Sequence, residues 1–247
     1  MAPAETIAEP TTTERTAVIL AGGLGSRLRP YTVVLPKPLM PIGESPILEV
    51  IIRQLARDGF RRIILAVNHQ ADLLRAYFGD GKRLGVDISY SLETTPLGTM
   101  GPLRLMGSLP EHFIVMNGDV LCDLDFGAFF EAHVDENQLF TIAASEREQL
   151  IDYGVLGYEN GELVSFTEKP RSAYLVSMGV YCVSKRVLDW IPEGKPYGFD
   201  QLMLAFLEEK HKVRVQPHSG YWLDIGRPDD YFKAVDEWPK LKAGLGL

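Results

Sequence analysis

The sequence predicts an α/β fold: a single Rossmann-like domain with a mostly parallel central sheet flanked by helices, continued by a β-rich part. Three observations support this prediction. Short apolar runs alternate with amphipathic segments through the first half of the chain. A glycine-rich loop and a glycine–aspartate turn directly follow two of these runs, as ligand-binding loops do in parallel sheets. An Asn-Gly pair between two later apolar runs indicates a hairpin.

The first half is assigned from these patterns. Residues 17–21 (AVILA) read as a fully buried strand. Residues 46–55 read as an amphipathic helix, with Ser45 as its cap and Pro46 at its first position. The same patterns then predict, in order, a strand at 62–67, a helix at 71–78, a strand at 86–92, a short helix at 100–106 and a strand at 113–116. Such alternation implies a mostly parallel sheet covered on both faces.

The second half changes character. Residues 154–157 and 163–166 flank the turn at Asn160-Gly161 and predict a hairpin. A strand is expected at 178–183, followed by helices near 185–190 and 199–209. We expect this part to extend the same sheet. The chain is treated as one domain over residues 16–240, because no linker or internal repeat divides it.

Composition sets further limits. With 247 residues, 46% of them apolar, the chain can bury a large core. Residues 1–15 are polar and rich in Thr, Glu and Pro, which predicts a disordered tail rather than a secretory signal. No run approaches the roughly 18 apolar residues of a membrane span. A net charge of −8 argues against nucleic acid as a partner, since no surplus cations would displace counterions.

The two cysteines and five histidines carry no recognisable chemistry. Cys122 and Cys182 lie in apolar contexts, and we expect two buried free thiols in a reducing, cytoplasmic compartment. The histidines show no metal-ligand spacing, and we expect structural or surface roles for His69, His112, His133, His211 and His218.

The glycine loop is the most informative feature. Leu20 and Ala21 end the first strand, and Gly22, Gly23 and Gly25 then allow backbone N–H groups to approach an anion closely. Two cations follow: Arg27, and Lys37 held between two prolines. Many donors on a stiff segment suit a polyphosphate. The third glycine of a dinucleotide fingerprint is absent, as is the Gly-Lys-Ser/Thr run of a P-loop.

These residues resemble a known family. The runs LAGGLGSRLRP (20–30) and PKPL (36–39) are similar to the signature of sugar-1-phosphate nucleotidylyltransferases, the nucleotide-sugar pyrophosphorylases. Further motifs recur in the expected order: PLGT (96–99), NGD (117–119), DYGV (152–155), EKP (168–170), MGVY (178–181) and WLDIG (222–226). The resemblance covers about residues 16–238. It implies a glycosyltransferase-A-like fold and two substrates, a nucleoside triphosphate and a sugar 1-phosphate; whether the chain forms a homo-oligomer is left open.

The implied reaction is attack by a sugar phosphate oxygen on the α-phosphorus, which releases pyrophosphate. The nucleophile is already anionic, so the protein must align and neutralise two polyanions. We expect Asp119 and Asp224 to hold Mg²⁺, a cation that prefers carboxylates and phosphate oxygens. Arg27 is expected at the β- and γ-phosphates, and Lys37 is expected near the α-phosphate. For Arg29 two roles stay open, a phosphate contact and a surface ion pair.

The resemblance also implies a sugar side and a base side. Glu168 would accept hydrogen bonds from sugar hydroxyls, and Lys169 would neutralise the sugar phosphate. Asn117, Tyr153, Gly154 and Gly179 would complete the sugar site. Glu93 is expected at the base, together with Gly98 and Thr99. A carboxylate can accept both N1–H and N2–H of guanine, which favours GTP. The runs PKPLMP (36–41) and LGT (97–99) also resemble those of mannose- and heptose-1-phosphate guanylyltransferases more than those of thymidylyltransferases.

Several alternatives stay open. Uracil or thymine could replace guanine, and Met100 departs from the small residue usual after Leu-Gly-Thr in the family. The acceptor could be a cyclitol phosphate or phosphocholine instead of a sugar phosphate. A catalytically silent relative would have lost Arg27, Lys37, Asp119 or Asp224, and all four are present.

Overall fold

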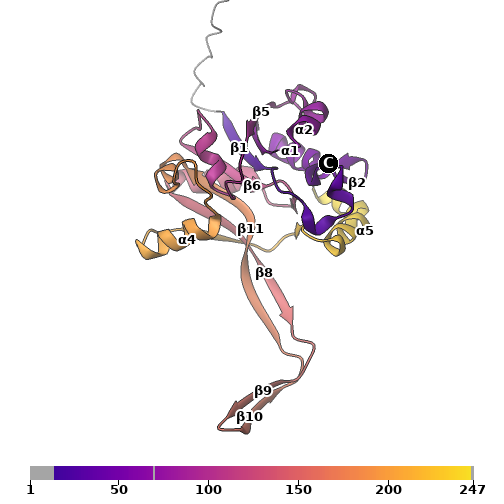
Figure 1. Cartoon of the computed structure of the whole chain (residues 1–247), viewed down its shortest axis with the longest axis vertical. Coiled ribbons are helices and arrows are strands. Elements are labelled where there is room, and N and C mark those ends of the chain that lie inside the picture. Colours follow the sequence, from indigo (N-terminus) through magenta and orange to yellow (C-terminus); the bar gives the residue numbers. More distant parts are fainter. Residues whose placement is uncertain (1–13, 69, 246–247) are drawn as a thin grey trace, which may run out of the picture.

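The computed structural model describes residues 14–68 and 70–245, which form a rounded body with a long two-stranded arm (Figure 1). The central sheet has seven strands in the order β12-β8-β11-β6-β1-β4-β5. Strands β5, β4, β1 and β6 are parallel; β11 runs antiparallel to β6 and to β8, and β12 is parallel to β8. The predicted α/β class with a mostly parallel sheet is confirmed.

The strands of this sheet are β1 (Arg15–Leu20), β4 (Phe60–Val67), β5 (Asp87–Leu92), β6 (His112–Asn117), β8 (Phe140–Leu150), β11 (Arg171–Ser184) and β12 (Arg214–His218). Smaller pairs are β2 (Pro41–Ile42) with β3 (Ser45–Pro46), β7 (Val120–Cys122) with β13 (Trp222–Asp224), and β9 (Val155–Glu159) with β10 (Glu162–Thr167). The α-helices are α1 (Ile47–Arg57), α2 (Ala71–Phe78), α3 (Phe126–Asp135), α4 (Phe199–Glu208) and α5 (Pro228–Gly244).

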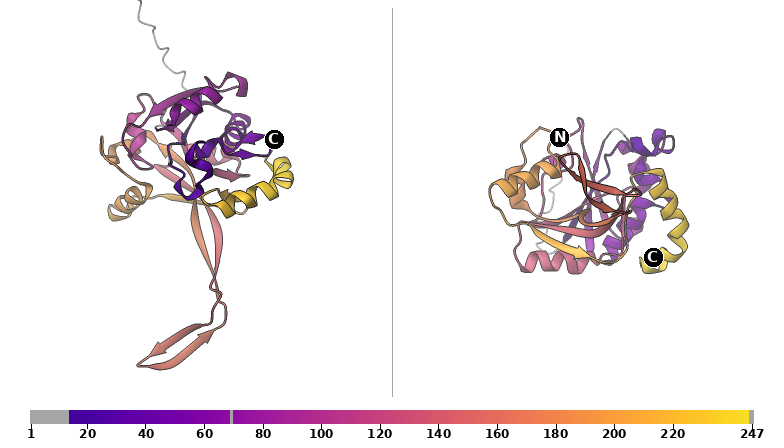
Figure 2. Two further views of the ribbon diagram at one scale, coloured as in Figure 1. Left: turned by 45° about the vertical axis from the view of Figure 1, so that its right-hand side comes forward. Right: turned by 90° about the horizontal axis from the view of Figure 1, so that it is seen from below.

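The two faces of the sheet carry separate apolar cores, as period-two alternation along β1 requires. Ala17 and Ile19 face the core built with α1, α2, α3 and α5, whereas Val18 faces the core built with α4 and the 3₁₀ segments Gly101–Leu105 and Lys185–Trp190. Figure 2 shows α4 and α5 on different sides of the body. The sheet is thus covered on both faces, as predicted, and its strand ends are held in a rigid frame.

Some local predictions were wrong. Ser45 does not cap α1: it pairs in β3, and Pro46 takes the cap position without a side-chain hydrogen bond. The segment predicted as a short helix at 100–106 is a 3₁₀ helix, and so is that near 185–190. Strand β1 begins at Arg15, the last residue assigned to the tail; residues 1–13 of that tail lie outside the described chain.

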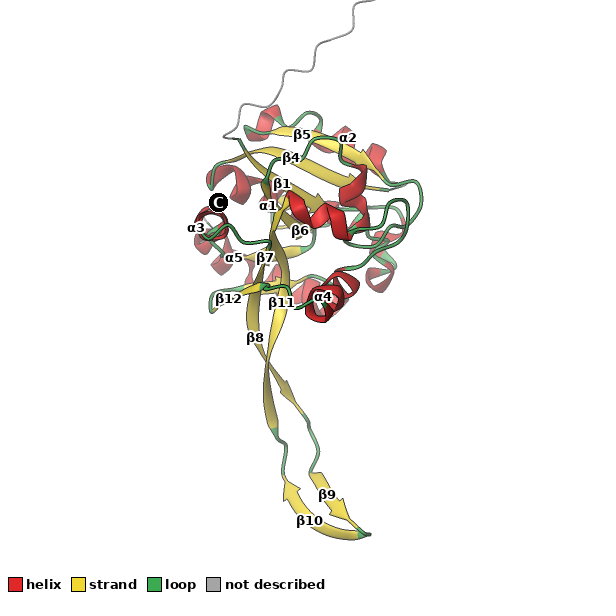
Figure 3. Cartoon of the chain, turned by 90° about the vertical axis from the view of Figure 1, so that its left-hand side faces the viewer, coloured by secondary structure: helices red, strands yellow, loops and turns green. Residues whose placement is uncertain are grey.

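The predicted hairpin exists but does not extend the sheet. Strands β8 and β11 pair beyond the body, from Ser177–Ala144 to Arg171–Leu150, and β9 and β10 form a separate pair at the far end (Figure 3). We call residues 146–175 the arm. Every residue of β10 is exposed. The other predicted strand of this half, within β11, does extend the sheet, together with β8 and β12.

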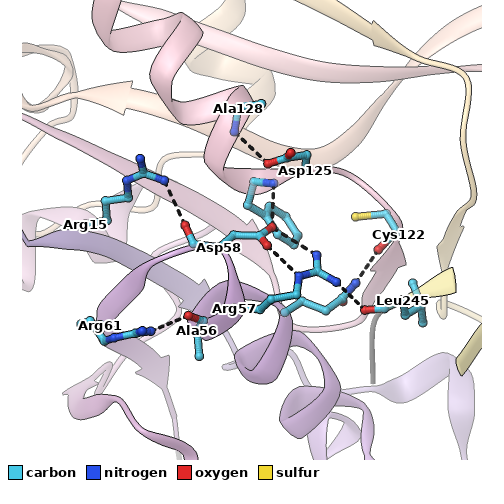
Figure 4. Close-up of polar contacts among 11 residues, drawn as sticks. Arg15, Ala56, Arg57, Asp58, Arg61, Cys122, Asp125, Ala128 and Leu245 are labelled. Carbon is cyan, nitrogen blue, oxygen red and sulfur yellow. Dashed lines mark hydrogen bonds and ion pairs between the residues drawn. The ribbon is translucent and has the colours of Figure 1, made fainter. Parts of the chain in front are cut away.

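A polar cluster around Asp58 joins distant segments of the body (Figure 4). Its carboxylate accepts from the Phe126 N–H that opens α3, at 3.0 Å, and pairs with Arg57, at 2.7 Å. Its carbonyl accepts from Arg15 at 2.9 Å, and Arg57 donates to the carbonyl of Leu245 at 2.7 Å. The carboxylate fixes the end of α1 against α3, while Arg57 and Arg15 extend the link to the chain's last turn and to β1.

The cysteines and one histidine behave as expected. Cys122 and Cys182 are free and buried, and burial raises the pKa of both thiols. His133 is fully buried between His112 and Thr141, and burial lowers its pKa to about 4, so it is neutral and structural. Within the described residues, no helix has the length and apolar character needed to cross a bilayer.

Candidate active site

A cavity of about 710 Å³ opens at the carboxyl ends of β1, β4, β5 and β6, where ligands bind in open parallel sheets. Its lining contains eight of the residues predicted from the sequence: Leu20, Gly22, Gly23, Glu93, Gly98, Thr99, Asn117 and Asp119. Leu20 and Asn117 are paired neighbours on β1 and β6, so the glycine loop and the Asn-Gly-Asp turn leave adjacent strands side by side. The predicted convergence of these two loops is confirmed.

The glycine loop is held open by contacts at both ends. Ala21 continues the ladder, donating its N–H to the carbonyl of Ala66 at 2.8 Å, and it does not line the cavity. Gly25 also lies outside the lining: its φ of 59° is left-handed, and a Cβ there would lie 2.9 Å from the Thr32 side chain. Thr32 also donates to the carbonyl of Gly25 at 2.6 Å. Only glycine lets this loop pack so closely on the segment that carries Lys37.

Four charged residues gather beside the cavity. Lys37, at the start of a 3₁₀ turn, pairs with the carboxylate of Asp119. Asp224 pairs with Val120 across β13 and β7, and the N–H of Ile225 donates to the Asp119 carbonyl at 3.0 Å. The Arg27 guanidinium belongs to this group too. It and the Asp224 carboxylate both lie next to Gly226: a Cβ added to Gly226 would be 3.8 Å from the guanidinium and 3.6 Å from the carboxylate. Three loops and one strand pair therefore bring two carboxylates and two cations together.

The electrostatics of this group leave room for more positive charge. Burial, and then the neighbouring Asp119 carboxylate, raise the pKa of Asp224, while Lys37 and Arg27 partly offset both effects. One oxygen of Asp119, Oδ1, is buried without a hydrogen-bond partner. A buried carboxylate oxygen with no donor is costly unless a ligand completes it. The group is therefore incomplete in the protein alone.

These residues fit the expected magnesium ion. No group of three or more His, Cys, Asp or Glu side chains stands ready to hold a metal among the described residues. Mg²⁺ does not require one, since it is commonly bound by one or two carboxylates plus substrate phosphates and water. The Oδ1 atom of Asp119 has no hydrogen-bond partner, and burial and the neighbouring Asp119 carboxylate raise the pKa of Asp224. A bound cation would give Oδ1 a partner and would stabilise the ionised form of Asp224.

The loop that was expected to contact the base, residues 93–99, is fixed in place by a hydrogen bond and by close backbone packing. Glu93 accepts the N–H of Leu97 through Oε2 at 2.9 Å, and Oε1 lies 3.6 Å from where a Cβ of Gly22 would be. Gly98 has a left-handed φ of 77°, and a Cβ there would lie 2.8 Å from the Tyr197 carbonyl. One oxygen of Glu93 thus fixes the loop, and the other lies against Gly22 of the glycine loop.

Some assigned roles look different in three dimensions. Thr99 lines the cavity but accepts from the N–H of Phe199 at 2.8 Å, which ties the loop to the start of α4. Gly179 is not part of the cavity lining: a Cβ there would lie 2.6 Å from the amide nitrogen of Asn117. The missing side chain therefore makes room for Asn117, which does line the cavity.

Four predicted sugar-site residues lie together but far from the cavity. Tyr153, Gly154, Glu168 and Lys169 sit where the arm joins its terminal hairpin: the Lys169 N–H donates to the Tyr153 carbonyl at 3.2 Å, and a Cβ at Gly154 would lie 3.2 Å from Glu168 Oε2. Lys169 pairs with Asp152 at 2.8 Å. None of them lines the cavity, and Figure 1 shows this part of the chain projecting from the body.

Sequence reasoning missed some residues of the cavity. Asn68 lines it and donates its side-chain N–H to the carbonyl of Gly22. Its position directly after β4 was a usable signal, since it matches the positions of the other two loops. Tyr197 does not line the cavity but holds the loop after Glu93. It was not detectable, because its carbonyl accepts from Met100 and Gly101, both at 3.0 Å, across about a hundred residues of sequence.

The model of the family described as nucleotidyl transferase matches residues 16–240. The chain belongs to this family. Mannose-1-phosphate guanylyltransferase catalytic subunit beta of Drosophila melanogaster is 35% identical over 248 residues, covering 94% of this chain and 67% of that protein. The protein of the same description from Danio rerio is 36% identical over 228 residues, covering 89% of this chain and 63% of that protein.

This nucleotidyl transferase chain spans about two thirds of the length of the relatives it matches. Among solved structures, HddC from Yersinia pseudotuberculosis complexed with GMP-PN has a TM-score of 0.68 and 29% identity, covering 91% of this chain and 99% of that one. The fold is therefore that of the family.

Proposed function

We propose that this protein transfers a nucleotidyl group, guanylyl preferred, from a nucleoside triphosphate to a sugar 1-phosphate. The observation that carries the proposal is the group formed by Arg27, Lys37, Asp119 and Asp224 beside the cavity, whose lining includes Asp119. Two cations beside two carboxylates suit a reaction in which the protein must neutralise and align phosphates rather than supply a nucleophile.

The chemistry follows from the placement of these groups. A sugar phosphate oxygen forms a bond to the α-phosphorus as the bond from that phosphorus to the β-phosphate bridging oxygen breaks, and the electron pair leaves with pyrophosphate. Lys37 would offset charge at the α-phosphate, and Arg27, exposed at the end of the glycine loop, would hold the leaving phosphates. Asp119 and Asp224 would hold Mg²⁺, which supplies charge neutralisation and polarises phosphoryl oxygens when bound.

The choice of guanine is supported by Glu93. Glu93 lines the cavity, and a carboxylate accepts the paired N1–H and N2–H donors of guanine. Relatives at 35–36% identity are described as mannose-1-phosphate guanylyltransferases, and the HddC structure holds GMP-PN. Mannose 1-phosphate is therefore the first acceptor to test.

The test is a panel of reactions scored by pyrophosphate release. The protein is incubated with Mg²⁺, one of GTP, ATP, UTP or dTTP, and mannose, glucose or heptose 1-phosphate. We expect turnover with GTP to exceed that with the other triphosphates and to stop in excess EDTA. Asp119→Asn serves as the matched inactive control. Absence of pyrophosphate release with every pair would refute the proposal, and a preference for UTP or dTTP would refute its guanylyl part.

A further inference from the structure

We propose that the arm completes the sugar side of the active site in a second copy of this chain, so that two copies exchange arms. This inference rests on the proposed function, since it assigns the sugar phosphate to Glu168 and Lys169. The structure supplies three reasons: the cavity lacks what the arm carries, the arm cannot serve its own cavity, and the arm is apolar along its length.

The cavity lacks a cation for a second phosphate. Among the described residues that line it, there is no lysine or arginine, and Lys37 beside it is already paired with Asp119. Arg27 stands on the glycine-loop side. A sugar 1-phosphate would bring further negative charge, which needs a positive partner. On the arm, Lys169 pairs with Asp152, but both side chains are more than half exposed, so solvent weakens this pair and a phosphate can compete for the ammonium. The neighbouring Glu168 is a carboxylate suited to sugar hydroxyls.

The arm cannot reach its own cavity as folded. Strand β8 runs without a break from Phe140, buried in the sheet, to Leu150 on the arm, and β11 pairs with it along the arm. Six residue steps of about 3.4 Å place the Leu150–Arg171 pair roughly 20 Å beyond the Ala144–Ser177 pair. Glu168 lies farther out still. Folding back would break this ladder, whereas another molecule can meet the arm as it stands.

The arm also exposes more apolar surface than an isolated hairpin tolerates. A two-stranded hairpin is marginally stable in water unless its apolar side is covered. The exposed large apolar side chains of the arm are Leu150, Ile151, Tyr153, Val155, Leu156, Tyr158, Leu163, Val164, Phe166, Tyr174 and Leu175. Tyr158 and Leu163 are directly opposite each other across β9 and β10 and are 75% and 64% exposed.

The body offers a surface of matching chemistry next to the cavity. We call Leu24, Tyr31, Val33, Val34 and Phe232 the apolar rim; all five are exposed, at 48–79%. Leu24 lines the cavity, and the rings of Tyr31 and Phe232 lie 6.5 Å apart. A partner's arm seated on this rim would cover apolar surface on both sides. A two-fold axis would make the exchange reciprocal and closed, as in swapped dimers.

Complementation between two defective variants tests the exchange. One variant is Lys37→Ala, which damages the body, and the other is Glu168→Ala with Lys169→Ala, which damages only the exposed arm. Each alone should lose at least about 10²-fold in kcat/KM. The two are co-expressed with different tags, and hetero-dimers are purified on both. With exchange, one site combines an intact body with an intact arm, so about half of the parent activity returns.

Three results would overturn the proposal. Without exchange, both sites of the hetero-dimer carry one defect, and activity stays at the level of the single variants. An arm variant with parental activity would remove the arm from the sugar site. A parent that is monomeric by sedimentation at assay concentration would leave no second copy to supply an arm.

A second measurement separates this proposal from the proposed function. Unlabelled and ¹⁵N-labelled chains are mixed, unfolded and refolded together, treated with an amine cross-linker and analysed for links from Lys169. Links between chains of different isotope are expected and do not depend on turnover; links only within one isotope would refute the exchange even in an active enzyme. Tyr158→Ser with Leu163→Ser should weaken the dimer, whereas Leu204→Ser with Leu207→Ser, equally exposed on α4, should not.

Discussion

Glu93→Gln tests the base assignment most directly, because the structure fixes how the new amide must orient. Leu97 is buried, and its N–H donates to one Glu93 oxygen at 2.9 Å. An unpaired buried N–H costs about 1–3 kcal/mol, so the glutamine oxygen should keep this bond. The NH₂ group then takes the place of Oε1, so one of the two guanine donors would meet a donor instead of an acceptor.

The expected loss follows from that mismatch. One mismatched buried hydrogen bond costs on the order of 1–3 kcal/mol, which corresponds to about 5- to 150-fold in kcat/KM for GTP. Turnover of UTP and dTTP should fall much less. Steady-state pyrophosphate release with each triphosphate measures this, and circular dichroism confirms that the loop change leaves the fold intact. An unchanged GTP preference in Glu93→Gln would refute the assignment of Glu93 to guanine, while leaving the phosphate assignments standing.

Three further changes probe the site and the frame that supports it. Arg27→Ala and Lys37→Ala should each lower kcat by about 10²-fold or more while the fold is kept, as measured by pyrophosphate release and circular dichroism; a parental kcat would reduce the glycine loop to a turn. Asp58→Ala should lower the free energy of unfolding by about 2–4 kcal/mol because it leaves the Phe126 N–H and Arg57 without their acceptor, and Asp58→Asn should lose less; equal stability in urea would contradict this. Burial opposes ionisation of Glu49, but hydrogen bonds from Arg83, Arg53 and Tyr77 outweigh it and lower its pKa, so its stabilising effect is present above the ordinary glutamate pKa and is lost as pH falls through the lowered value. The difference in free energy of unfolding between the parent and Glu49→Gln should therefore shrink as the pH is lowered. A difference that does not change with pH would contradict a stabilising role for ionised Glu49.

Sequence patterns predicted the half of the fold in which local and global preferences agree. The helix at residues 71–78 has the bounds of α2, and the strand predicted at 62–67 lies within β4. Buried parallel strands produce uninterrupted apolar runs, and these are readable without tertiary information. The glycine loop and the Asn-Gly-Asp turn were placed correctly at one edge because parallel strands all end there.

The cap of α1 and the contacts that fix the loop after Glu93 were not predicted, because both depend on tertiary structure. Ser45 has a side chain suited to an N-cap, but its backbone pairs with Ile42 in the short β2–β3 pair. Pro46 therefore occupies the N-cap position of α1. The loop after Glu93 depends on the carbonyl of Tyr197, which accepts from Met100 and Gly101. Contacts between segments so far apart in sequence leave no mark on local periodicity.

The arm shows how a correct local prediction can still misplace a site. Asn160-Gly161 predicted the hairpin, and Tyr153, Gly154, Glu168 and Lys169 do lie together at its base. The error was to assume that the hairpin joins the sheet, because apolar side chains on both strands indicate burial but do not identify the surface that buries them. In the structure, β8 and β11 carry this apolar surface away from the body and toward solvent. The projecting hairpin exposes leucine, tyrosine and phenylalanine side chains, and the apolar rim lies exposed beside the cavity. Both apolar surfaces are covered if the arm of one molecule packs against the rim of another molecule in the same assembly.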